Sequence, residues 1–146
     1  MFLLDTNVLV HAANADSPSH LTARNFLQTT RSSTAPWALA WSILYEFWRV
    51  VTHPRVLSTP LSRVQVRAFV RALIASGSLE ILAETDRHAS FFEKVLDELR
   101  EPAANLAHDA HLVALMREHG ISEICTLDTD FHRFSGIRVI DPLRSK

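Results

Sequence analysis

Five acidic residues of this chain occupy positions where a carboxylate is costly unless something binds it. Asp5 follows the apolar run at the start of the chain, and Asp128 and Asp130 follow a second apolar run. Glu46 and Asp109 lie within predicted helices, on the same faces as apolar side chains. The other acids fall on polar helix faces or in loops. Because a charged carboxylate is expensive to bury, this shared placement indicates a common role.

Each acid also has a simpler explanation. Asp5, or Thr6 beside it, would cap the helix that follows. Glu46 would form an ion pair with Arg49, three residues further along its helix. Asp109, near the start of its helix, would complement the helix dipole. These explanations treat the acids one at a time and leave their common placement beside apolar residues unexplained.

Carboxylates that lie close together repel one another, and a divalent cation removes that repulsion. An all-oxygen site suits Mg²⁺ or Mn²⁺ better than zinc. The eight histidines show no zinc-binding spacing, and His108 and His111 lack the cysteine or carboxylate framework of a zinc site. We therefore interpret most of the histidines as structural or surface residues.

A carboxylate-rich metal site is suited to phosphoryl transfer, because the cation lowers the pKa of an attacking water and stabilises the leaving oxygen. The sequence has no glycine-rich phosphate loop, which argues against a nucleoside triphosphatase. The acids favour hydrolysis of a phosphodiester. Arg63, Arg67 and Arg71 recur every four residues on a predicted helix and would track a phosphate backbone, or would simply form a solvated face.

Apolar patterning predicts the elements that position these acids. Short apolar runs indicate buried parallel strands at residues 2–4, 79–82, 123–127 and 138–140. Helices are expected over residues 8–14, 18–30, 41–51, 62–76 and 104–119, with another after a cap at Thr85 or Asp86, and residues 32–35 as a polar loop or very short strand. The carboxyl edge of a parallel sheet is where active sites collect, so the acids are expected to meet there.

Three of these helices have further expected features. Ser17 with Pro18 would start the second helix, and Ser62 with Gln65 would form a capping box. The helix over residues 41–51 is apolar nearly all round and should be largely buried.

Length and composition fit one domain. The chain has 146 residues, is 47% hydrophobic and has a formal net charge of −1, so any polyanion must be met by a local basic patch. Its single cysteine, Cys125, indicates a reducing cytoplasm, and neither a signal peptide nor a membrane-spanning run is visible. We predict a single three-layer α/β/α domain over residues 1–146, with a central, mostly parallel sheet and Asp5 on a central strand.

Four segments together resemble a known family. LLDTNVLV at the start, LYEFWRVV in the aromatic helix, HDAHLVAL before a glycine, and TLDTDF near the end are similar to the motifs of PIN-domain ribonucleases. The closest resemblance is to VapC-type toxins of bacterial toxin–antitoxin pairs, and it covers essentially the whole chain.

The resemblance implies the roles of individual residues and the partners of the protein. Asp5, Glu46, Asp109 and Asp128 would form the acidic quartet that binds Mg²⁺ or Mn²⁺, Asp130 would assist as a further ligand, and Thr6 would help to order the site. The family further implies endoribonuclease activity on RNA, a homodimer and a VapB-type antitoxin. The apolar face of the helix over residues 62–76 is a second reason to expect the homodimer.

Three other functions compete with the toxin interpretation. A haloacid-dehalogenase-like phosphatase also places an aspartate after its first strand, but it needs a second aspartate where this chain has Asn7. A PIN-like module that only binds a divalent ion or RNA would be expected to lack some of the acids. A PIN nuclease of RNA processing would act without an antitoxin, and the small size of the chain favours the toxin.

Overall fold

A computed structural model describes residues 1–144 of the chain. Its centre is a five-stranded sheet in which all neighbouring strands are parallel. The strands are β1 (Leu3–Leu4), β2 (Trp37–Ala40), β3 (Leu79–Leu82), β4 (Glu123–Cys125) and β5 (Arg138–Ile140), in the spatial order β3-β2-β1-β4-β5. The central strand is therefore β1, and Asp5 follows it directly, as predicted.

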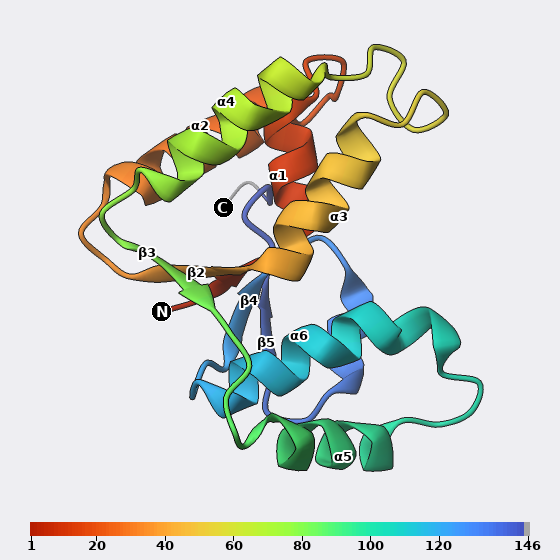
Figure 1. Ribbon diagram of the computed structural model, residues 1–146. Helices are drawn as coiled ribbons and strands as arrows, with labels where there is room; N and C mark the ends of the chain where they lie inside the picture. Colours follow the sequence, from red (N-terminus) through yellow and green to blue (C-terminus); the bar gives the residue numbers. More distant parts are fainter. Residues whose placement is uncertain (145–146) are drawn as a thin grey trace.

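Helices cover both faces of the sheet. Six α-helices are described: α1 (Thr6–Ala13), α2 (His20–Ser32), α3 (Trp41–Val51), α4 (Arg63–Ile74), α5 (His88–Glu98) and α6 (Ala107–Glu118). Figure 1 shows α1 to α4 gathered on one side of the sheet and α5 and α6 on the other. This arrangement confirms the three-layer α/β/α prediction.

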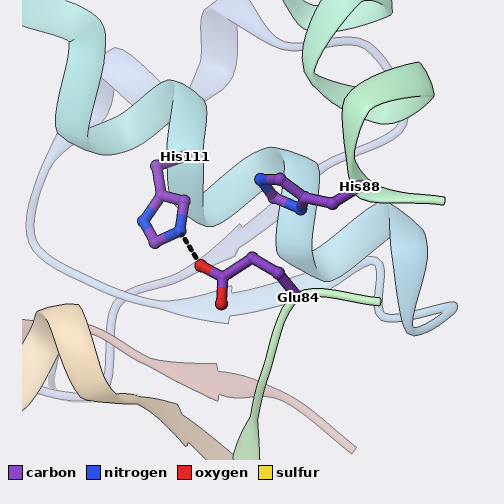
Figure 2. Close-up of side chains that lie close together, drawn as sticks. All are labelled: Glu84, His88 and His111. Carbon is purple, nitrogen blue, oxygen red and sulfur yellow. Dashed lines mark hydrogen bonds and ion pairs between the residues drawn. The ribbon is translucent and has the colours of Figure 1, made fainter. Parts of the chain in front are cut away.

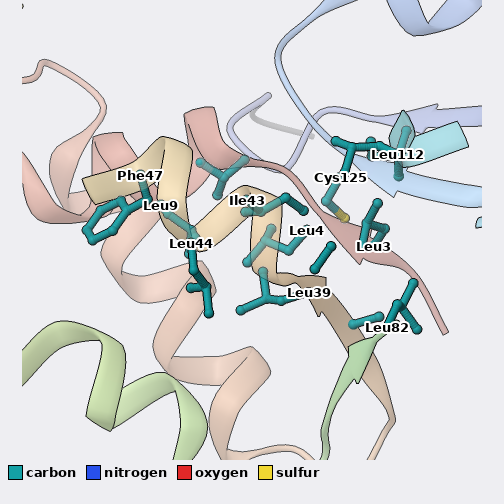
Figure 3. Close-up of a cluster of buried hydrophobic side chains, with 14 of the residues drawn as sticks. Leu3, Leu4, Leu9, Leu39, Ile43, Leu44, Phe47, Leu82, Leu112 and Cys125 are labelled. Atoms are coloured by element: carbon teal, nitrogen blue, oxygen red, sulfur yellow. The ribbon is translucent and has the colours of Figure 1, made fainter. Parts of the chain in front are cut away.

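Burial on both faces explains why the strands consist of apolar residues. Leu3 and Leu4 are fully buried, and so are all four residues of β2. Figure 3 shows Leu4, Leu39 and Ile43 within one apolar cluster formed by β1, β2 and α3. Burying a leucine or isoleucine side chain contributes about 1.5–3 kcal/mol, so this cluster holds the strand ends firmly. The helices α1 and α3, which begin at or just after those ends, are fixed with them.

One strand differs from the expectation. The sequence analysis assigned no strand to Trp37–Ala40 and placed a polar loop or very short strand at residues 32–35, which instead contain the end of α2 and a bend. That assignment is wrong. The strand was hard to recognise because β2 ends at Ala40 and α3 begins at the next residue. The apolar residues of the strand and of the helix form one continuous run, and no turn residue separates them.

Several helix ends are shifted from their predicted positions. Helix α1 begins at Thr6 because the Asp5 carboxylate caps it, and α2 begins at His20 because Ser17 accepts a hydrogen bond from the amide of Ser19 instead of opening a helix. The expected helix from residue 104 starts as a separate 3₁₀ turn (η1, Ala104–Leu106). The strand expected at residues 123–127 ends at Cys125.

The helix caps and the exposure of α3 give a mixed result. The capping box of Ser62 and Gln65 is present at the start of α4, as predicted. Neither Thr85 nor Asp86 is the cap of α5, which begins only at His88. The expectation that the helix over residues 41–51 is largely buried is wrong for one face, where Trp41, Tyr45 and Trp48 are 51%, 64% and 48% exposed.

Candidate active site

The site begins where the two central strands β1 and β4 end side by side. Leu4 pairs with Cys125 in the parallel ladder, and the amide of Asp5 donates to the Cys125 carbonyl at 3.0 Å. The next residue of each strand, Asp5 and Thr126, is therefore brought to the same edge. The Thr126 hydroxyl donates to Asp5 Oδ2 at 2.7 Å, which joins residues 121 positions apart in the chain.

The Asp5 carboxylate is buried and held from three directions. Its Oδ1 accepts a hydrogen bond from the Thr6 amide at 2.7 Å, so the capping interpretation is correct. Its Oδ2 also accepts from the Asn7 side-chain amide at 3.0 Å. Capping does not exclude a further role, because a carboxylate has about four lone-pair positions and these contacts use three.

Asn7 and Thr126 are hydrogen-bond partners of the acids that sequence reasoning missed. The Asn7 side chain donates to the Thr126 hydroxyl at 2.8 Å and accepts from the Leu127 amide at 3.2 Å, and the Asp128 amide donates to the Thr126 hydroxyl at 3.0 Å. These bonds fix Asp5 and Asp128 relative to each other. The available signal was their position, since each lies within two residues of a predicted acidic ligand.

Three acids converge on one point. Asp109 in α6, Asp128 after β4 and Asp130 in the 3₁₀ helix η2 (Thr129–Arg133) each offer a carboxylate oxygen, and these oxygens lie within 4.8 Å of one another. Asp128 also accepts from the Asp130 amide at 2.8 Å, which orders the turn that carries both. The structure thus brings these three predicted ligands together.

Burial and repulsion among the acids raise the pKa values of two carboxylates in this group. Burial raises the pKa of Asp109 to about 7, with added contributions from the charges of Asp128, Asp5 and Asp130. Burial also raises the pKa of Asp5, although hydrogen bonds from Thr126 and Thr6 partly offset the effect. Carboxylates in this state gain from a nearby cation, which would restore their charged forms.

Glu46 shares the pocket and is also ion-paired. It lines a hollow of about 270 Å³ together with Asp5, Asp109 and Asp128. Its two carboxylate oxygens accept from Arg49 at 2.6 and 3.0 Å, and this hydrogen-bonded arginine lowers the Glu46 pKa. Both explanations offered for Glu46 are therefore visible, because the carboxylate is paired with Arg49 and also lines the pocket of the acids.

Two polar atoms in the pocket support a bound ion or water. Within residues 1–144, Thr6 Oγ1 and His108 Nε2 are buried and have no hydrogen-bond partner, and both residues line the hollow of the acids. A buried polar atom without a partner costs about 1–3 kcal/mol, so a hydrated cation that satisfied it would be favoured. This observation and the all-carboxylate donor set fit Mg²⁺ or Mn²⁺.

The arginine stripe lies away from the acids. Arg63, Arg67 and Arg71 are exposed on α4, as expected of a solvated face. The first two line a shallow groove of about 320 Å³, whose floor includes the aromatic rings of α3.

Comparison with known proteins supports the resemblance to PIN-domain ribonucleases that the motifs indicated. The family model of the PIN domain matches residues 2–137. Ribonuclease VapC48 of Mycobacterium tuberculosis is 36% identical over 138 residues, which is 94% of this chain and 94% of that protein.

Solved structures share the fold. The VapC20 toxin of Mycobacterium tuberculosis, described as cleaving the sarcin-ricin loop, has a TM-score of 0.64 at 22% identity and covers 94% of this chain and 99% of its own. VapBC2 of Rickettsia felis, solved on a DNA fragment from its promoter, has a TM-score of 0.68 at 17% identity, covering 95% of this chain and 96% of that chain.

The acidic cluster at the carboxyl edge of the parallel sheet fits the class that these comparisons show, a metal-dependent nuclease. The chain belongs to the PIN domain family, within the VapC-type ribonucleases of toxin–antitoxin systems.

Proposed function

We propose that this protein is a toxin that hydrolyses RNA phosphodiester bonds endonucleolytically, with a Mg²⁺ or Mn²⁺ ion held by Asp5, Asp109 and Asp128. The observation that carries the proposal is the convergence of Asp109, Asp128 and Asp130 within 4.8 Å, with the Asp109 pKa raised to about 7. Glu46 and Asp130 complete the ligand set, and Thr6 helps to order the site through its amide, which donates to Asp5.

Some of these residues would bind the ion, and others position the residues that bind it. Asp109 and Asp128 supply charge where the ion binds, while Asn7 and Thr126 hold Asp5 in place. A bound divalent ion supplies an activated water and stabilises the charge that develops on the phosphate. Arg49 is paired with Glu46 at the pocket and is exposed, so its guanidinium would be available to a phosphate of the RNA.

Cleavage of RNA by the purified protein tests the proposal. Total cellular RNA is incubated with Mg²⁺ or Mn²⁺, with an EDTA control. Asp109→Asn removes a charge and a ligand while keeping side-chain volume, so we expect cleavage to fall at least 100-fold. Asp97→Asn, an exposed acid on α5, is the matched control and should cleave normally. Cleavage by Asp109→Asn at the wild-type rate would remove that residue from the mechanism.

We further propose an antitoxin of the VapB type as the partner, and a cytoplasmic location. The support is the family and the solved neighbours, which include VapBC2 and the FitAB complex. Within residues 1–144, no helix is long and apolar enough to span a bilayer. If the tagged protein, isolated from its own host, carries a small protein whose removal switches on RNA cleavage, the partner is established. Isolation of a fully active nuclease without such an inhibitor would favour a role in RNA processing.

A homodimer is also proposed, with its contact surface moved from where the sequence placed it. The apolar face of α4 is largely used inside the molecule, because Val66 and Leu73 are buried. An exposed apolar surface lies on the neighbouring face of α3, with Trp41, Tyr45 and Trp48. Exposed aromatic side chains in one groove are typical of protein interfaces.

A further inference from the structure

A second group of metal-ligating side chains lies on the other side of the sheet from α3. Glu84 follows β3, His88 opens α5, and His111 lies in α6, and one ligand atom from each lies within 4.8 Å of the others. Figure 2 shows the two imidazole rings and the carboxylate pointing toward one another from these three segments. His111 Nε2 is 2.7 Å from Glu84 Oε1, and the two rings meet edge to face with centroids 5.8 Å apart.

The orientation of His88 is set by a buried acid behind it. Glu118 has a fully buried side chain that contacts His88 Nδ1 at 2.7 Å and accepts from the Thr85 amide at 2.7 Å and from the Thr85 hydroxyl. Burial raises the pKa of Glu118, but the hydrogen bonds from Thr85 and His88 outweigh it and lower the pKa to about 2.

That hydrogen bond leaves one nitrogen of His88 available. Because Nδ1 of His88 is engaged by Glu118, Nε2 is the ring nitrogen left for a metal. A carboxylate that orients a histidine from behind is a recurrent feature of zinc sites, where it fixes the tautomer and raises ligand basicity.

We propose that Glu84, His88 and His111 form a binding site for Zn²⁺ or a similar borderline divalent cation, separate from the acidic pocket. Two imidazoles and one carboxylate are the ligands of open zinc sites, in which water takes the fourth position. Zinc bonds of about 2.0–2.1 Å place ligand atoms about 3.3 Å apart in a tetrahedron, so side-chain rotations close the present group around an ion. The hydrogen now shared by His111 and Glu84 moves to Nδ1 of His111 or to solvent.

Sequence spacing gives no sign of this site, because the three ligands come from three separate segments. Bound zinc would join the end of β3, the start of α5 and the middle of α6. Since α6 also carries Asp109, the ion would stabilise the helix that presents a nuclease ligand. The proposal does not depend on the nuclease activity, because its measurements are of metal binding.

Metal titration of the chelator-treated protein tests the site. The double variant Asp109→Asn/Asp128→Asn is used as the background, so that zinc does not bind the acidic pocket. We expect one Zn²⁺ per chain by calorimetry, no displacement by excess Mg²⁺, and a visible absorption band when Co²⁺ replaces zinc. His111→Gln and Glu84→Gln should each weaken zinc binding at least tenfold and abolish the thermal stabilisation that zinc gives.

His119→Gln is the matched control. His119 follows the end of α6 and bonds to the Ala83 carbonyl, beside Glu84, yet it lies outside the group of three and should bind zinc normally. If circular dichroism shows that His111→Gln is unfolded, Glu84→Gln decides, because Glu84 is half exposed. Unchanged zinc affinity in the folded ligand variants, or displacement of zinc by Mg²⁺, would overturn the proposal. The group would then be two hydrogen-bonded pairs, His88 with Glu118 and His111 with Glu84.

Discussion

At the scale of single residues, Asp109 is a proposed metal ligand whose carboxylate lowers the free energy of unfolding of the metal-free protein. Its pKa is raised from 3.8 to about 7 by burial and by neighbouring acids. In the unfolded chain the carboxyl ionises near its ordinary pKa, whereas in the folded protein it resists ionisation. The metal-free protein should therefore lose stability as pH rises from about 4 to about 7, with no further loss from this group above that range.

Asp109→Asn should remove this loss. In EDTA at pH 8 we expect the variant to be more stable than the wild type by about 1–2 kcal/mol, a figure reduced because solvent screens the half-buried carboxylate. At pH 4.5 the two proteins should differ little. Urea unfolding at both pH values measures the effect, and a variant that is less stable at pH 8 would show that repulsion among the acids is unimportant.

Thr126 is predicted to act through Asp5. Its hydroxyl contacts Asp5, Asn7 and the Asp128 amide, so Thr126→Val should misplace two of the proposed metal ligands. Loss of a group that orients metal ligands typically costs 10–100-fold, and we expect kcat to fall by about that factor with little change in KM. Thr126→Ser keeps the hydroxyl and should retain most of the activity. Equal rates for the valine and serine variants would contradict a positioning role.

The sequence predicted the acids better than the groups that hold them. Asp5 and Asp128 could be found because an apolar strand ending on a carboxylate is a distinctive pattern. Asn7 and Thr126 offered only the weaker signal of their position beside an acid, because an amide or hydroxyl near a strand end is equally common in turns and caps. The ion pair of Glu46 was offered as an alternative, but only the structure shows that it coexists with a place in the pocket.

At the scale of elements, the start of α4 rests on a capping box. Ser62 accepts from the Gln65 amide at 3.2 Å, and the Gln65 side chain accepts from the Ser62 amide at 2.8 Å. Ser62→Ala should lower the free energy of unfolding by about 1 kcal/mol, measured by urea denaturation. Ser90→Ala, at an exposed position inside α5, is the control and should cause no loss. Equal effects at the two positions would show that the cap is not stabilising.

Elements with a clear period or a clear end were predictable, and β2 was not. The capping box marked the start of α4, and apolar runs bounded by polar residues marked β1 and β3. β2 joins α3 without a turn, so composition alone cannot divide strand from helix there. The exposed face of α3 was also not predictable from composition, because an aromatic side chain counts as core in a sequence pattern whether it packs inward or outward.

At the scale of the whole molecule, the aromatic face of α3 predicts self-association. Light scattering at micromolar concentration should give twice the 16.5 kDa mass of one chain. Trp48→Glu places a charge in the groove and should shift the protein to a monomer. Phe92→Glu on α5 is a matched control, because Phe92 is 47% exposed and Trp48 is 48% exposed. A monomeric wild type, or a dimer unaffected by Trp48→Glu, would contradict the proposal.

A single domain over residues 1–146 also stays a prediction.

The central place of β1 has a consequence for the time at which the enzyme becomes active. Asp5 is synthesised more than a hundred residues before its neighbours Thr126 and Asp128. A growing chain that lacks Asp128 and Asp130 therefore has an incomplete set of the proposed ligands and should not cut RNA, including the RNA of the ribosome that is making it. A fragment of residues 1–115 should show no cleavage with Mg²⁺ or Mn²⁺. Cleavage can begin only after β4 and the acids that follow it have joined β1, which leaves an interval between the synthesis of Asp5 and the start of activity.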